Sequence, residues 1–193
     1  MSDLVFLTKS FADRVALAAH VVGLAQSTDE VTPPPLMGGR SAAEKALAQI
    51  DPQAYAASRN HLDGAVTKLS PYIRQGILSL DEVRNHALTL VSDTKAVEKF
   101  IQELAWRDFW QRIYMTYPEG IWQDAEPYKT GYVATDYAVD LPSDIATGHT
   151  GVACIDQFIA MLLETGYLHN HARMYLAAYV VHWRQIRWQA GAA

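Results

Sequence analysis

A short stretch, VTKLSPY from Val66 to Tyr72, places two hydroxyls and an ammonium group together, on Thr67, Ser70 and Lys68, around a proline at position 71. These groups, helped by neighbouring backbone N–H groups, suit a loop that binds an anion. The same residue types also form local turns, in which the hydroxyls bond only to nearby backbone. From these residues alone, an anion-binding loop and a plain turn both remain open.

A second candidate lies on the strongest expected helix, KAVEKFIQELAWRDFWQRIYMTY, which begins near Asp93 and stops at Pro118. At 3.6 residues per turn, one stripe of this helix holds four residues, with Trp106 beside it: Phe100, Glu103, Arg107 and Trp110. Such a stripe suits a planar aromatic ligand. It equally suits a core helix with an internal Glu103–Arg107 pair.

The stretch LHNHAR adds two polar side chains that share one face of the last helix. An amide such as Asn170 can hydrogen-bond the edge of a heteroaromatic ring, and an arginine such as Arg173 can neutralise a buried anion. His169 and His171 are two positions apart and point to different faces, and no HExxH or CxxC spacing occurs. We therefore predict no metal site.

Nucleophilic catalysis has little support in the sequence. Cys154 lies on an apolar helix, VACIDQF, where we expect it to be a small buried hydrophobe. No GxSxG elbow or P-loop occurs, and GHTG at 148–151 is too short to indicate a phosphate loop.

The composition indicates one globular domain over residues 1–193, because half of the residues are hydrophobic and the chain is long enough to bury a core. A single cysteine and no signal peptide predict a reducing, cytoplasmic setting, and no segment has the roughly 20 apolar residues of a membrane helix. A net charge of −5 argues against coating nucleic acid by charge alone, while a local basic patch remains open.

The periodicity predicts an all-α chain with no strand. We expect helices in the ranges 4–25, 41–50, 79–91, 93–117, 152–165 and 170–188, separated by irregular chain at 26–40 and 117–150. Ser41 with Glu44, and Ser79 with Glu82, have the spacing of a capping box, and Gly166 is placed to end a helix in the left-handed conformation.

Five motifs in order resemble the helical FAD-binding domain of DNA photolyases and cryptochromes. They are GGRSAAEKAL, YAASRN, TKLSPYIRQGILSLDEV, ELAWRDFW and GHTGVACIDQFIAMLLETGYLHNHARMYLAAY, and the similarity covers about residues 38 to 190. The resemblance implies a multi-helix bundle that binds FAD. It also implies light-driven repair of cyclobutane pyrimidine dimers in UV-damaged DNA, by electron transfer from reduced flavin; if active, the enzyme is a deoxyribodipyrimidine photolyase, a carbon–carbon lyase.

The resemblance also implies a role for each matching position. The residues implied to bind FAD are Tyr55, Thr67, Lys68, Leu69, Ser70, Phe100, Arg107, Asn170 and Arg173. Catalytic roles fall on Glu103, which meets the dimer, on Trp106, which stacks on it, and on Trp188, in the electron-transfer chain. The residues implied to contact DNA are Arg59, Trp106, Arg107 and His171.

Three positions depart from the family pattern: Val66 replaces a Thr, Lys68 an Arg, and Ile145 the outermost electron-transfer Trp. The antenna domain and the DGD…NN…W segment have no counterpart here, so we expect a FAD-binding domain truncated at its C-terminus. An exposed apolar surface would then favour self-association or a partner that supplies the missing segment. Two alternatives remain: a flavin light or redox sensor without repair, and a cofactor-free helical interaction module.

Overall fold

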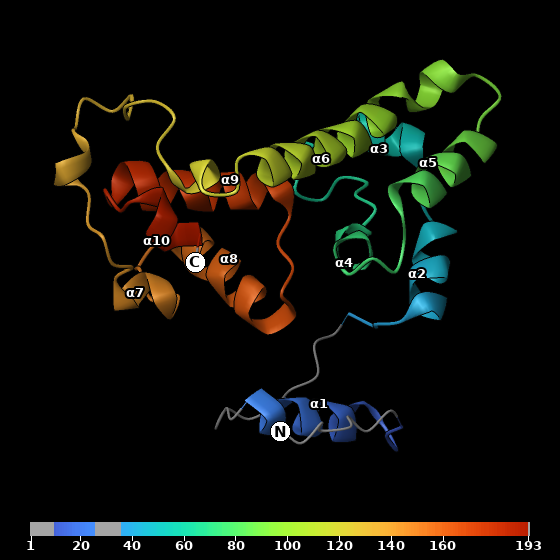
Figure 1. Cartoon of the computed structure of the whole chain (residues 1–193), viewed down its shortest axis with the longest axis horizontal. Helices are drawn as coiled ribbons and strands as arrows, with labels where there is room; N and C mark the ends of the chain where they lie inside the picture. Colours follow the sequence, from blue (N-terminus) through green and yellow to red (C-terminus); the bar gives the residue numbers. More distant parts are fainter. Residues whose placement is uncertain (1–9, 26–35, 193) are drawn as a thin grey trace. The chain divides into compact units, whose positions relative to one another are not determined.

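The computed structural model describes residues 10–25 and 36–192, and these residues are almost entirely helical or irregular (Figure 1). Within these ranges the one β pairing is an isolated bridge between Ala138 and Ile186. The all-α prediction is confirmed.

The helices are short apart from α6, and several are single turns. In chain order they are α1 (Arg14–Ala25), α2 (Arg40–Leu47), α3 (Pro52–Ser58), α4 (Ser70–Arg74), α5 (Leu80–Thr89), η1 (Thr94–Val97), α6 (Glu98–Thr116), η2 (Gly120–Trp122), η3 (Ala134–Asp136), α7 (Ser143–Ala146), α8 (Ala153–Thr165), α9 (Asn170–Ala178), η4 (Tyr179–Trp183) and α10 (Trp188–Ala192). Of the η elements, η4 is a π-helical turn that continues α9, and the others are 3-10 turns.

The chain divides into two compact units, Met1–Leu36 and Met37–Ala193. In the first unit, Asp13 begins α1 by accepting a hydrogen bond from the backbone N–H of Ala16, at 2.8 Å. The helix was expected from position 4, but it begins at Arg14: residues 10–13 are described and are not helical, and residues 4–9 lie outside the described part. One domain over the whole chain stays a prediction.

The two capping boxes have opposite outcomes. Ser79 accepts the backbone N–H of Glu82 at 3.1 Å, and the Glu82 carboxylate accepts the backbone N–H of Ser79 at 2.7 Å, which confirms this cap. The box at Ser41 and Glu44 is wrong, because α2 begins one residue earlier, after Gly39. Glu44 pairs with Arg40 instead, at 2.8 Å.

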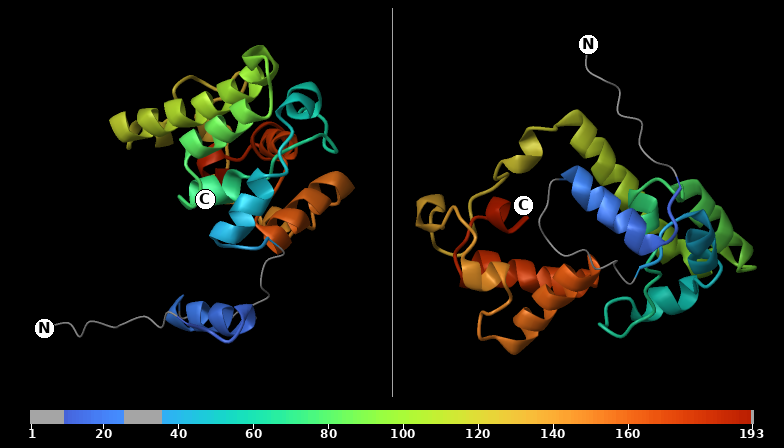
Figure 2. Two further views of the ribbon diagram at one scale, coloured as in Figure 1. Left: turned by 90° about the vertical axis from the view of Figure 1, so that its right-hand side faces the viewer. Right: turned by 90° about the horizontal axis from the view of Figure 1, so that it is seen from below.

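The long helix is confirmed, with a 3-10 start. Asp93 accepts the backbone N–H of Lys95 at 3.0 Å and begins η1, which leads directly into α6. Val97 and Phe100 are buried, and α6 packs against α3 and α5, with α3 visible beside it in Figure 1. Figure 2 shows the connection from α6 to α7 as open chain with short helical turns.

A hydrophobic core lies between α7, α8 and η4. Its buried residues are Ile145, Ile155, Ile159, Val180 and Ile186. Arg184 ties this region together by donating two hydrogen bonds to Asp144, at 2.7 and 3.2 Å. Gly166 ends α8 with φ 66°, as predicted.

The expectation of a buried Cys154 is wrong. Its side chain is exposed, because the buried stripe of α8 falls on the next residue, Ile155, and on Ile159 one turn later. In the described ranges, no helix has the length and apolar character needed to span a membrane. A cytoplasmic location stays a prediction.

Candidate functional site

The predicted anion loop lines a hollow of about 300 Å³ in the second unit. The loop supplies five lining residues and α3, α9 and the turn before α9 supply the rest: Tyr55, Val66, Thr67, Lys68, Leu69, Ser70, Tyr167, Leu168, Asn170 and Arg173. Seven of the positions that the motifs assign to FAD therefore meet in one hollow, and two of them, Lys68 and Arg173, are cationic.

The loop has an unusual backbone at Lys68, where φ is 53°. A non-glycine residue in the left-handed region is uncommon and needs support from its surroundings. Leu69 supplies it, because its side chain is 1% exposed and its backbone is right-handed helical. Successive left- and right-handed residues turn their N–H groups to one side, the arrangement of an anion-binding nest.

Local hydrogen bonding accounts for only part of this loop. The backbone N–H of Leu69 donates to the Thr67 hydroxyl at 3.4 Å, a long bond. The Lys68 ammonium forms no ion pair in the described residues. The turn and the anion-binding loop are thus compatible, since the local bond leaves the ammonium and the Ser70 hydroxyl available.

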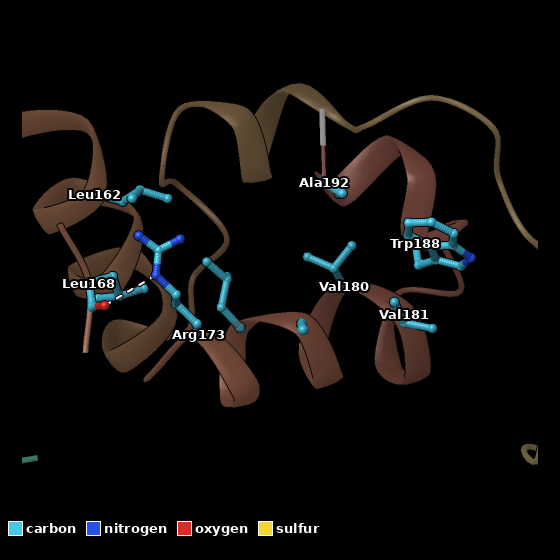
Figure 3. Close-up of a pocket in the computed structure, with 10 residues that line it drawn as sticks. Leu162, Leu168, Arg173, Val180, Val181, Trp188 and Ala192 are labelled. Carbon is cyan, nitrogen blue, oxygen red and sulfur yellow. Dashed lines mark hydrogen bonds between the residues drawn. The ribbon is translucent and has the colours of Figure 1, made fainter. Parts of the chain in front are cut away.

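An apolar hollow of about 290 Å³ shares Leu168 and Arg173 with the loop hollow (Figure 3). Arg173 stands at one end beside Leu162 and Leu168, Trp188 stands at the other, and Val180 lies between them. The Nε of Arg173 donates a hydrogen bond to the backbone carbonyl of Leu168 at 3.1 Å, drawn as the dashed line in Figure 3. This bond leaves the two terminal nitrogens of the guanidinium to meet a ligand.

A third hollow, of about 460 Å³, also reaches Arg173 and contains Arg74 and Arg107. Arg173 lines all three hollows, and Leu168, Ser70 and Tyr167 each line two of them. The three neighbouring hollows together form the candidate site, which has an apolar arm, a loop of hydroxyl and ammonium groups, and a cationic arm. Arg173 is the residue common to all three arms.

Next to the loop hollow, four residues from α3, its C-cap and α6 form a packed network. Phe100 is buried and meets the Tyr55 ring edge to face, with centroids 5.2 Å apart. The guanidinium of Arg59 lies over the same ring at 6.0 Å and pairs with the Glu103 carboxylate at 3.6 Å. Burial, and then the charge of Glu103, raise the pKa of Tyr55.

This network changes two expectations. Phe100 lines none of the three hollows and supports Tyr55 from behind, so its direct contact with FAD stays a prediction. The internal Glu103–Arg107 pair is wrong, because Glu103 pairs with Lys99 at 2.9 Å and with Arg59. Arg107 turns to the cationic arm, where its Nε is buried without a hydrogen-bond partner.

Trp106 lies on an exposed aromatic face of α6. Its side chain is 52% exposed and meets Phe109 edge to face, and Phe109 meets Trp110 in the same way. An exposed indole can stack on a base. Contact of Trp106 with a dimer stays a prediction.

His169, at the start of α9, has a structural role, while the predicted contact of His171 with DNA stays a prediction. His169 is buried, and its Nδ1 accepts the backbone N–H of His171 at 3.1 Å, so it caps the helix. Burial, and then the charge of His171, lower the pKa of His169. Asn170 projects into the loop hollow from this capped turn. In the described residues, no three His, Cys, Asp or Glu side chains gather where they could hold a metal ion.

Trp188 has a partner that the sequence did not indicate. Its ring stacks on Trp122 with centroids 5.9 Å apart and an interplanar angle of 5°, and its Nε1 donates to Asp124 at 2.6 Å. Trp122 comes from the irregular connection, where no period holds, so only the fold could reveal the pair. Tyr167 and Arg74 also line the site, although the sequence analysis gave neither residue a role.

The GHTG stretch has a structural role at the start of α8. Asp156 accepts the backbone N–H and the hydroxyl of Thr150, at 2.7 and 2.6 Å, and the N–H of Gly151 at 3.2 Å. These bonds lower the pKa of Asp156 and use the N–H groups that a phosphate would need. The stretch is thus the entry to α8.

Residues 100–193 match the family described as the FAD binding domain of DNA photolyase. A deoxyribodipyrimidine photo-lyase of Alkalihalophilus pseudofirmus is 32% identical over 128 residues, which are 65% of this chain and 26% of that protein. The chain spans 26%, 18% and 27% of the length of three such relatives, so it corresponds to one part of them.

Solved structures show the same fold. A class III photolyase from Agrobacterium tumefaciens aligns with a TM-score of 0.66 at 22% identity, covering 81% of this chain and 34% of that one. A photolyase from Sulfolobus tokodaii, solved with two FAD molecules, aligns with a TM-score of 0.63 at 24% identity, covering 88% of this chain and 37% of that one. The motifs and the photolyase relatives agree with this match, and the chain carries, over residues 100–193, the helical FAD-binding domain of the photolyase and cryptochrome family.

Proposed function

We propose that the chain binds FAD in the hollows that meet at Arg173, and that the bound cofactor serves light-driven repair of cyclobutane pyrimidine dimers in DNA. One observation carries the proposal: the apolar arm and the polar loop hollow are both lined by Arg173. FAD has the same division, since a planar ring system is linked to a diphosphate.

The residues present fit the cofactor. Thr67, Lys68 and Ser70 offer hydroxyls, an ammonium group and a nest-like backbone for a diphosphate. The apolar arm offers Leu168 and Val180 for a ring. When bound, FAD would supply the light-excited electron that splits the dimer.

The chain itself would position the reactants and exclude water. Arg173 would hold negative charge beside the ring, because its terminal guanidinium nitrogens stay unpaired. A dimer has to leave the DNA stack to reach the site, and the exposed indole of Trp106 offers a stacking surface for it. Glu103 would accept a hydrogen bond from the dimer in exchange for one from Lys99 or Arg59.

The experiment is a repair assay with FAD-loaded protein and an oligonucleotide that contains one thymine dimer, in light and in darkness. We expect loss of the dimer in light only, and a large reduction in the Trp106→Ala variant. Trp183→Ala is the matched control, because Trp183 is 82% exposed and lines none of the three hollows.

The remaining outcomes would overturn parts of the proposal. Protein that retains FAD and leaves dimers intact in light would be a flavin sensor. Protein that takes up no FAD would be a helical interaction module, as the second alternative holds.

A further inference from the structure

A groove outside the candidate site lies between the start of α5 and one side of α6, and its volume is about 510 Å³. Its apolar lining consists of Leu80 from α5 and of Ile101, Leu104 and Ala105 from α6. Its charged lining consists of Asp81, Arg84, Asp108 and Arg112. None of these residues lines any of the three hollows of the candidate site. The groove is therefore a surface that the proposed function does not use.

The side of α6 that lines the groove continues along the helix to Met115. Four residues on this side recur at intervals of three, four and seven positions, which return to the same side of a helix with 3.6 residues per turn: Ile101, Leu104, Asp108 and Met115. The side chain of Met115 is 81% exposed. It cannot fill the groove of its own chain, because a rise of about 1.5 Å per residue places Met115 about 15 Å from Ala105 along the helix. A second molecule can bring its methionine to this place.

The charges on this side of α6 are arranged so that two copies complement each other. Asp108 and Arg112 pair within one chain at 2.7 Å, and they lie two positions before and two positions after Trp110. Ala105 and Met115 lie five positions before and five positions after the same residue. A two-fold axis at the level of Trp110, perpendicular to α6, brings Asp108 opposite Arg112 of a second copy. The same axis brings Met115 opposite Ala105 of that copy.

We propose that this side of α6 binds the same side of α6 in a second copy of the chain, with the two helices antiparallel, to form a homodimer. Met115 of each copy enters the groove of the other copy beside Leu104, and the two pairs of Asp108 and Arg112 combine into a network of four charges. Exposed ion pairs contribute little affinity by themselves. The buried apolar side chains therefore supply most of the affinity, and the charges select the antiparallel orientation.

The homodimer leaves the exposed aromatic face of α6 open. Trp106 and Trp110 are each two positions from Asp108, and an α-helix turns about 100° per residue. Both indoles therefore project from the opposite side of α6. The pairing involves none of the residues that we assign to FAD, so it does not depend on the proposed function.

The test measures the association of the full chain by sedimentation equilibrium, without FAD, at protein concentrations from about 1 μM to about 1 mM. We expect a monomer–dimer equilibrium in the wild type. Asp108→Arg and Arg112→Asp should each weaken the dimer about tenfold or more, because each places like charges opposite one another twice. Lys129→Glu is the matched control, since Lys129 is also exposed and pairs with Glu126 at 2.7 Å.

Mixing the two charge variants separates an effect on the interface from an effect on the helix. Each variant loses the pair of Asp108 and Arg112 within its own chain, so both would be weakened if that pair only supported α6. In the mixture, two arginines of one variant face two aspartates of the other. We therefore expect a heterodimer at least tenfold tighter than either variant alone, and a doubly exchanged chain, Asp108→Arg with Arg112→Asp, that regains the wild-type affinity.

Met115→Ser tests the apolar contact. It should weaken the dimer about tenfold or more, because a methionine is buried twice in each dimer. Met161→Ser, at an exposed position of α8, is the control and should match the wild type.

Three results would overturn the interface. The first is wild-type protein that stays monomeric over the whole concentration range, which would leave the groove without a second copy as its occupant. The second is a dimer that Met115→Ser and both charge variants leave unchanged. The third is a mixture of the two charge variants that associates no better than either alone. Protein that dimerises through α6 but takes up no FAD would refute the proposed function and leave this interface standing.

Discussion

The Nε of Arg173 donates a hydrogen bond to the Leu168 carbonyl at 3.1 Å, and this contact holds the guanidinium where three hollows meet. Leu168 is 3% exposed, so the bond is fixed to the packed part of the fold. A flexible arginine is thereby held in place for a ligand before the ligand arrives.

Arg173→Ala should weaken FAD binding by about 1.5 to 3 kcal/mol, because a charge-assisted contact to the cofactor is lost. Titration of FAD fluorescence against protein measures the change. Arg84→Ala serves as the control. FAD affinity equal to wild type in the Arg173→Ala variant would remove this residue from the site.

Trp106→Ala should leave FAD binding unchanged and weaken binding of dimer-containing DNA by about 1 to 3 kcal/mol, the usual worth of a base stacked on an aromatic ring. Half of the indole is exposed, so the fold loses little packing. Equal loss of both ligands would show that the residue is structural.

The start of α9 should respond to pH through His169. Its pKa is lowered, chiefly by burial, so between the folded value and the unfolded value of about 6.5 the unfolded chain binds more protons. This contribution to stability is present above about pH 6.5 and is lost as the pH falls through that range. Protonation of Nδ1 also removes the acceptor for the His171 N–H.

His169→Asn keeps a good capping side chain that does not titrate. Its melting temperature should therefore fall less than that of wild type between about pH 7.5 and about pH 5.5. His61→Asn, at an exposed position, is the control. Parallel pH profiles for His169→Asn and wild type would rule out His169 as the titrating group.

The two serine caps offer a stability test. Ser79→Ala should lower the free energy of unfolding by about 1 kcal/mol, because its hydroxyl accepts the Glu82 N–H at the start of α5. Ser41→Ala should change it by less than about 0.5 kcal/mol, since Ser41 lies inside α2 and caps nothing. Urea denaturation followed by circular dichroism measures both, and equal losses would contradict the assignment.

Local rules predicted those parts of the fold that local chemistry determines. Asp93, Ser79 and Gly166 mark helix ends as expected, because a side-chain cap or a left-handed glycine acts over a few residues. The prediction of a cap at Ser41 was wrong where Arg40 makes contacts to residues distant in the sequence. Arg40 donates to the Ile77 carbonyl at 2.9 Å and pairs with Glu82 at 2.6 Å, and these contacts accompany a helix that starts earlier.

In the candidate site, too, the sequence predicted local features and missed those that depend on packing between helices. The motifs identified the residues of the loop and of α9, and the fold brings Tyr55, Lys68 and Arg173 to one hollow. The position of Phe100 behind Tyr55 and the gathering of Arg74 with Arg107 depend on how separate helices pack. No spacing along one helix carries that information.

The most direct test of the account is the visible absorption spectrum of the purified protein, recorded before and after incubation with FAD and removal of unbound cofactor. We predict the spectrum of a bound flavin in the wild type and a weaker one in Lys68→Ala, with Lys129→Ala, an exposed control, unchanged. A colourless wild-type protein that takes up no FAD would contradict the central claim that these helices form a flavin site.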